Sequence, residues 1–178
     1  MVKYINLNGI GFVRMYSSNR AKRIIIYIRK NNEVRVAIPK NISIDNAKEF
    51  VLSKTNWIKK TQKKISKKIV LDYSNINKKL AKKILIERLN KISIDTGLFY
   101  NKVSIRNQKT RWGSCSSLNN INLNINLINL PPRLIDYVIF HELVHTVEKD
   151  HSRKFWNLLD KYLPEAQNLN KELNNYAI

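Results

Sequence analysis

The three histidines of the chain all fall within one eleven-residue stretch, residues 141–151. His141 and His145 are four residues apart, so on a helix their imidazoles project from one face and could bind the same metal ion. Glu142 stands beside the first histidine, where a carboxylate can act on a metal-bound water. These residue types at this spacing predict a zinc hydrolase with one zinc ion per chain.

A third metal ligand is needed, because a catalytic zinc usually has three protein ligands and keeps a fourth position for water. His151 and Glu165 compete for this place. On an unbroken helix His151 would point away from the first pair, since six residues correspond to about 600° of rotation. The helix must therefore end near Glu148. Asp150 or Ser152 can then cap the next helix, and the turn between the two helices favours His151.

The second half of the chain, about residues 71–178, is expected to hold the metal site on a mixture of helices and strands. The predicted elements are a helix at about 78–96 that ends at Gly97, a strand at 102–107, a loop at 110–117, a strand at 121–127, a helix from Pro131-Pro132 that carries the histidines, and helices after Ser152 and at about 165–176. Apolar residues alternate with asparagines along 121–127, which is typical of a half-buried strand.

The segment Arg-Trp-Gly-Ser-Cys at residues 111–115 is interpreted mainly as a structural turn. Gly113 would allow a positive φ, and Trp112 and Cys115 would pack in the core. A nucleophilic role for Cys115 is disfavoured, because the metal already activates a nucleophile and every histidine is committed to it.

The first half, about residues 1–70, is expected to form a small antiparallel sheet followed by a basic helix. The predicted strands are 11–17, 23–29 and 33–38, and the helix begins at Ser43 or Asp45 and runs to about Lys68. Its predicted buried side consists of Phe50, Trp57, Ile58, Ile65 and Ile69. Its other side carries a series of lysines.

The positive charge is placed unevenly. The formal net charge is +20, and residues 1–111 contain 27 Lys and Arg against 6 Asp and Glu, whereas residues 112–178 contain 6 against 7. The basic half could therefore bind a polyanion such as a nucleotide or nucleic acid. The alternative is that the lysine side of the helix is simply a solvated surface.

Length and composition limit the remaining possibilities. A chain of 178 residues that is 43% hydrophobic is expected to form one domain over residues 1–178. The single cysteine, Cys115, excludes an internal disulfide and a multi-cysteine zinc site. No apolar run approaches the roughly 20 residues that span a bilayer, and no signal peptide is visible, so we expect a cytoplasmic protein without membrane contact.

A resemblance to a known family extends over most of the chain. It is carried by Arg-Trp-Gly-Ser-Cys at 111–115, the strand at 121–127, the Pro-Pro helix start, His-Glu-Leu-Val-His at 141–145, Asp-His-Ser at 150–152 with Phe155-Trp156, and upstream by the basic hairpin, residues 36–39 and Trp57-Ile58. Together these segments resemble the YgjP-like family of zinc metallopeptidases. The resemblance implies an α+β fold with a compact zincin-like core. It also implies His141, His145 and His151 as zinc ligands and Glu142 as the catalytic carboxylate.

The expected reaction is the cleavage of an amide bond in a peptide or protein by a zinc-activated water. Glu142 would act as general base and deliver the proton to the leaving amine. Arg111, Tyr137 and Asn124 are candidates for contacts to the substrate or to its oxyanion. The same activated water could attack phosphorus, so a zinc-dependent nucleotide or phosphoanhydride hydrolase is an alternative, and a nucleic-acid-associated protease is another.

Overall fold

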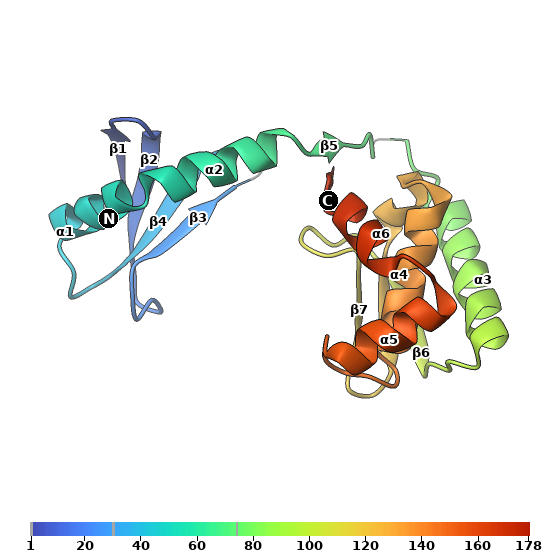
Figure 1. Cartoon of the computed structure of the whole chain (residues 1–178). Coiled ribbons are helices and arrows are strands. Elements are labelled where there is room, and N and C mark those ends of the chain that lie inside the picture. Colours follow the sequence, from blue (N-terminus) through green and yellow to red (C-terminus); the bar gives the residue numbers. More distant parts are fainter. Residues whose placement is uncertain (1, 30, 74) are drawn as a thin grey trace. The chain divides into compact units, whose positions relative to one another are not determined.

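The computed structural model describes residues 2–29, 31–73 and 75–178 (Figure 1). The chain splits into two compact units, residues 1–68 (unit 1) and 69–178 (unit 2), close to the predicted boundary between the basic and metal-binding halves. The expectation of a single domain over residues 1–178 stays a prediction. The mixture of helices and sheets confirms the α+β class. Among the described residues, no helix is both long and apolar enough to cross a membrane.

Unit 1 contains a four-stranded sheet in the order β1-β2-β4-β3. The strands are Val2–Leu7 (β1), Gly11–Ser18 (β2), Ile25–Ile28 (β3) and Val34–Pro39 (β4). The predicted antiparallel hairpin pairing is confirmed for β3 with β4, and β1 pairs with β2 in the same way. The sheet as a whole is mixed, because β2 and β4 run parallel. β1 is not among the predicted strands, since polar residues interrupt its apolar pattern.

Two helices, α1 (Ile44–Ser53) and α2 (Thr55–Ser66), lie over one face of this sheet (Figure 1). The Ser43 hydroxyl accepts a hydrogen bond from the Asn46 N–H at 3.1 Å and so caps α1, as expected. The predicted single helix is broken at Lys54, which lies between the two helices. Val51 and Ile58 are fully buried against the sheet and anchor the two helices to it.

The prediction for the buried side of this helix is only partly correct. Ile58 is buried, but Phe50 is 37% exposed, Trp57 50% and Ile69 47%. The apolar arc of the sequence is wider than the face that the sheet covers, so residues on the flank of the arc remain in contact with solvent. Ile69 is not in the helix at all, because it begins a short strand in unit 2.

The helices of unit 2 are α3 (Lys78–Thr96), α4 (Pro132–Val144), α5 (Arg153–Tyr162) and α6 (Ala166–Leu173). The predicted bounds of α3 are confirmed, and Gly97 ends it with a left-handed φ of 70°. The unit is closed by a two-stranded parallel pair, in which β5 (Ile69–Val70) lies beside β9 (Tyr176–Ala177). The phenol of Tyr73 donates a hydrogen bond to the Ala177 carbonyl at 2.6 Å and holds the same two ends together.

A three-stranded sheet in unit 2 has the order β6-β8-β7. Its strands are Lys102–Arg106 (β6), Gly113–Cys115 (β7) and Asn120–Asn124 (β8), and residues 125–129 form a 3₁₀ helix, η1. The prediction of one strand over 121–127 is therefore wrong beyond Asn124. The Asn124 side chain accepts a hydrogen bond from the Asn126 N–H at 3.1 Å, and this local turn stops the strand.

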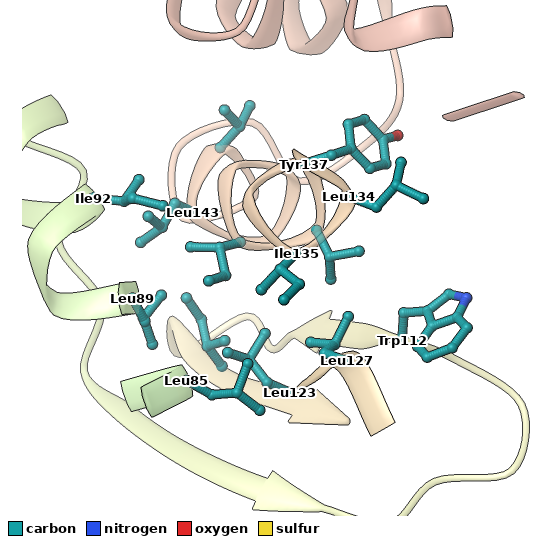
Figure 2. Close-up of a cluster of buried hydrophobic side chains, with 14 of the residues drawn as sticks. Leu85, Leu89, Ile92, Trp112, Leu123, Leu127, Leu134, Ile135, Tyr137 and Leu143 are labelled. Carbon is teal, nitrogen blue, oxygen red and sulfur yellow. The ribbon is translucent and has the colours of Figure 1, made fainter. Parts of the chain in front are cut away.

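The core of unit 2 lies between α4, α3 and the three-stranded sheet (Figure 2). All four residues predicted for the core side of α4 are buried, namely Leu134, Ile135, Val138 and Leu143. They meet Leu123 and Leu127 from β8 and η1, and Leu85 and Leu89 from α3. This packing fixes α4, and with it the histidine motif, against the sheet.

Candidate metal centre

The first two histidines lie at the end of α4. Pro131 and Pro132 begin this helix, where a missing N–H costs little, and His145 is its C-cap. The helix proper ends four residues before the expected Glu148. Hydrogen-bonded turns continue to that residue, since the Glu148 N–H donates to the Val144 carbonyl at 2.9 Å. The chain then turns, and α5 begins at Arg153. This turn returns His151 to the end of α4, as predicted.

The three imidazoles converge on one point. Nε2 of His151 lies 3.0 Å from Nε2 of His141 and 3.2 Å from Nε2 of His145. Nitrogens bound to one zinc at about 2.0–2.1 Å and at tetrahedral angles are roughly 3.4 Å apart. The observed spacing is close to that value, so this donor set fits a small divalent metal. Among the described residues, these three form the one cluster of histidine, cysteine or acidic side chains that could hold a metal ion.

The outer nitrogens of two imidazoles have hydrogen-bond partners. Nδ1 of His145 lies 2.8 Å from the Glu148 carbonyl oxygen, and Nδ1 of His141 lies 3.3 Å from the Tyr137 hydroxyl. A carbonyl can only accept, so the proton of His145 sits on Nδ1 and its lone pair on Nε2, toward the shared point. Such partners orient metal ligands and fix their tautomers.

The ring of Phe155 packs against all three imidazoles. Its centroid lies 4.9 Å from that of His141, 4.5 Å from His145 and 4.8 Å from His151. Phe155 is fully buried and comes from the first turn of α5. Its role at the site was not predicted, although its place four residues after the last histidine is a usable signal. The ring provides one apolar wall that restricts the positions of the imidazoles.

The electrostatics of the site favour neutral imidazoles. Burial, together with the neighbouring His145 and His151, lowers the pKa of His141 to about 3. Burial is also the main reason why the pKa of His145 is lowered. Because a metal ligand must be unprotonated, these two side chains are in the form that binds a cation.

Glu142 is a buried carboxyl, 5% exposed, between the two histidines of α4. Burial raises the pKa of Glu142 to about 8, and the charge of Arg111 acts in the opposite direction. This shift favours the protonated form of the carboxyl. A divalent cation nearby would favour the ionised form.

Gly113 lies directly against the Glu142 side chain. A Cβ placed on this glycine would come within 2.6 Å of Oε1, 2.7 Å of Cγ and 2.9 Å of Cδ of Glu142. Real Cβ atoms do not approach other atoms this closely. The prediction that Gly113 serves a positive φ is wrong, because its φ lies outside that range and it belongs to strand β7. The glycine is required for the close approach of the carboxyl.

If Glu142 acts as the base that the sequence predicts, replacing Gly113 with alanine is expected to lower kcat about 100-fold while the metal content stays unchanged, because the carboxyl must move by about 1 Å to clear the new methyl group. A hydrolysis assay and elemental analysis of the same preparation measure the two quantities. Ser114→Ala, one residue further along β7, is the matched control and should retain most activity. Full activity of Gly113→Ala would show that the contact does not position Glu142.

A pocket of about 370 Å³ opens onto these groups. Its lining comes from residues 111 and 113–117 on and around β7, and from the end of α4 and the turn that follows it: Arg111, Gly113, Ser114, Cys115, Ser116, Ser117, His141, Glu142, His145, Lys149 and His151. The segment 111–115 therefore forms one wall of the pocket, and its interpretation as only a structural turn is incomplete. Trp112 is buried in the core, as predicted, and Cys115 is partly buried.

Of the three residues predicted to contact substrate, one lines the pocket and two are buried. Arg111 is exposed and lines the pocket. Tyr137 is 2% exposed and stands behind His141, where burial raises the pKa of its phenol. Asn124 is fully buried, and its amide donates to the carbonyls of Gln108 and Arg111 at 2.8 and 2.9 Å. The expectation that Asn124 contacts substrate is therefore wrong, because its amide holds the loop before β7.

Two other residues considered from the sequence have different surroundings. Glu165 is the N-terminal residue before α6, with a left-handed φ of 64°, and it does not belong to the histidine cluster. The pKa of the Cys115 thiol is raised, mainly by burial, so that the thiolate needed for a nucleophile is disfavoured.

The chain was compared with known proteins. The family model described as YgjP-like, metallopeptidase domain, matches residues 22–77 and 68–176. A crystal structure of the metallopeptidase zymogen abylysin from Pyrococcus abyssi is 24% identical, covers 50% of this chain and 90% of its own, and has a TM-score of 0.45. No curated protein matches the chain. The match to the family model extends over most of the chain, and the chain therefore belongs to the YgjP-like family of metallopeptidases.

Proposed function

We propose that the protein is a zinc-dependent peptidase in which His141, His145 and His151 hold one zinc ion and Glu142 is the general base. The observation that carries this proposal is the convergence of three imidazole nitrogens beside a buried carboxyl, within one open pocket. Family membership supports hydrolysis of peptides or proteins. The assignment of the metal, its ligands and the base rests on the site itself.

The donor set supports zinc over other metals. Three neutral imidazoles are typical ligands for zinc, whereas magnesium and calcium prefer oxygen. A site with three protein ligands leaves a fourth position open, which is the pattern of catalytic rather than structural zinc. When bound, zinc would supply a Lewis acid that polarises the substrate carbonyl and lowers the pKa of a water to about 7.

Side chains of the protein would carry out the proton transfer, bind the oxyanion and orient the ligands. Glu142, held against Gly113, would accept a proton at its carboxylate as the amide is attacked and return it to the leaving nitrogen. Arg111 is the residue among the three predicted substrate contacts that lines the pocket, so it is our candidate for the oxyanion donor. Tyr137 and the Glu148 carbonyl would hold His141 and His145 in the ligand tautomer.

The position of β7 supports a peptide as substrate. This strand pairs with β8 on one side and forms the edge of its sheet, and all three of its residues line the pocket. An edge strand offers backbone donors and acceptors to an extended peptide, which can add to the sheet as a further strand. A nucleoside triphosphate has no such complementarity to this wall.

The direct test compares the purified zinc form on casein, on peptides and on nucleoside triphosphates. We expect cleavage of protein or peptide that is lost after removal of the metal by a chelator and restored by zinc. Hydrolysis of the triphosphates without cleavage of any protein or peptide would contradict the proposal and favour the phosphoanhydride alternative.

Replacing His151 with alanine is expected to weaken zinc binding much more than replacing Glu165 with glutamine, because only the histidine reaches the cluster. Loss of one of three ligands leaves two imidazoles, whereas Glu165→Gln preserves the size of a residue at the start of α6. Zinc titration with a competing chelator measures both affinities. The opposite order, in variants that remain folded by circular dichroism, would move the third ligand to Glu165.

A further inference from the structure

The sheet of unit 1 has two chemically different faces. Val13 and Met15 of β2 and Val34 and Val36 of β4 are at most 1% exposed and pack beneath α1 and α2. Because side chains alternate along a strand, the residues between them point to the other side. That side, called here the open face, carries rings and guanidinium groups: Tyr4, Phe12, Arg14, Tyr16, Tyr27 and Arg35.

The register of the strands arranges four of these residues in a single row. Tyr4 of β1 is opposite Arg14 of β2, Arg14 is opposite Arg35 of β4, and Arg35 is opposite Tyr27 of β3. Neighbouring strands are about 4.8 Å apart, so the row extends over roughly 14 Å with a tyrosine at each end. Tyr4 is 66% exposed and Tyr27 is 42% exposed. Phe12, on the same side of β2, is 72% exposed.

The centre of the row has unused capacity to bind an anion. Two arginines directly opposite each other on neighbouring strands repel. Glu33 accepts a hydrogen bond from Arg35 at 2.7 Å and also interacts electrostatically with Arg14, so one negative charge faces two positive charges. The Nε atoms of Arg14 and Arg35 are buried, so an anion on the open face would meet the terminal nitrogens of the guanidinium groups. Within the described part of the chain, Arg35 has an ion-pair partner and Arg14 has none. A phosphate above the row would offer acceptors to both groups and reduce their repulsion.

We propose that the open face binds single-stranded nucleic acid, with bases stacked on Tyr4 and Tyr27 and the backbone phosphates against Arg14 and Arg35. The charge of unit 1 supports this occupant, since its 68 residues contain 17 Lys and Arg and 3 Asp and Glu. Exposed rings beside cations are the usual arrangement for binding single strands without strong sequence preference. In a duplex the faces of the bases are covered, and the acidic side chains of a peptide carry charge but no flat ring that could stack on the tyrosines.

The test measures fluorescence anisotropy of labelled oligodeoxyuridylate and oligouridylate, which differ only in the sugar, with the full chain across a salt series. We expect binding of one or both, and their ratio identifies the preferred sugar. Tyr4→Thr should weaken binding about ten-fold, Tyr27→Thr by a similar factor, and the pair about 100-fold. Tyr4→Phe and Tyr27→Phe keep the rings and should bind like the natural chain. Arg14→Gln should reduce the salt slope by about 0.7.

Two controls separate this face from general charge and from loss of any exposed ring. Phe99→Thr removes a ring in unit 2 that is 69% exposed, and it should have no effect. The double change Lys60→Gln, Lys64→Gln removes charge from α2. It should lower the affinity by the same factor in the natural chain and in the variants that carry threonine in place of tyrosine. Absence of binding at low salt would overturn the proposal, and so would equal affinity for polyglutamate or for the same oligonucleotide paired with its complement. Unchanged affinity of the folded double variant Tyr4→Thr, Tyr27→Thr would also overturn it. Zinc content and peptidase activity do not enter these outcomes.

Discussion

Glutamine in place of Glu142 is expected to lower kcat by roughly 100- to 10,000-fold while the protein keeps its metal. Glutamine has nearly the same shape as glutamate, so it fits the space beside Gly113 that the Glu142 side chain occupies. Its amide cannot accept the proton that the carboxylate takes. The loss should therefore appear in kcat, with a smaller effect on KM.

The measurement combines steady-state kinetics on a peptide with elemental analysis of each preparation. Glu142→Asp is the informative companion, because it keeps the carboxylate but draws it back by one methylene from the position that Gly113 allows. We expect its activity to lie between that of the natural chain and that of Glu142→Gln. Undiminished turnover by metal-loaded Glu142→Gln would rule out Glu142 as the base.

The double variant His141→Ala, His145→Ala is expected to lose its zinc almost completely, since only one of three imidazoles would remain. The natural chain should retain about one zinc per chain, in keeping with a mononuclear site. Inductively coupled plasma mass spectrometry after gel filtration measures the ratio. Tyr137→Phe is the matched control, because it removes one hydrogen-bond partner of His141 and no ligand; it should weaken affinity by about 10- to 100-fold.

Both histidines contact Phe155, so their removal also leaves space beside that ring. Circular dichroism and thermal unfolding must therefore show that the double variant is folded before its metal content is interpreted. Stoichiometric zinc in the folded double variant would remove the basis for this metal site.

The histidine cluster could be predicted because its main determinants are local. A helix fixes the spacing of His141 and His145, and the turn that returns His151 depends on only six residues. The position of Gly113 against Glu142 could not be predicted in this way, because it results from packing of β7 on α4. The sequence indicated that a glycine was needed and suggested the wrong reason, a positive φ.

Other differences also arise from long-range structure. Apolar residues and asparagines do alternate over 121–127, as the strand prediction assumed. The side chain of Asn124 nevertheless caps a 3₁₀ helix that ends the strand, and its amide donates a hydrogen bond to the Gln108 carbonyl. The row on the open face depends on the parallel pairing of β2 with β4. Local patterns indicate each strand separately, and they do not indicate which strands become neighbours.

The pairing of β5 with β9 has a practical consequence for anyone who modifies the ends of this chain. The first residues of unit 2 are held by residues 175 and 177. The Ile69 N–H donates a hydrogen bond to the Asn175 carbonyl at 2.7 Å, and the Tyr73 hydroxyl donates one to the Ala177 carbonyl. A purification tag added after Ile178 would therefore emerge beside the junction that leads to unit 1. The same proximity makes unit 2 suited to circular permutation, in which a short linker joins residue 178 to residue 69 and new termini open in an exposed loop.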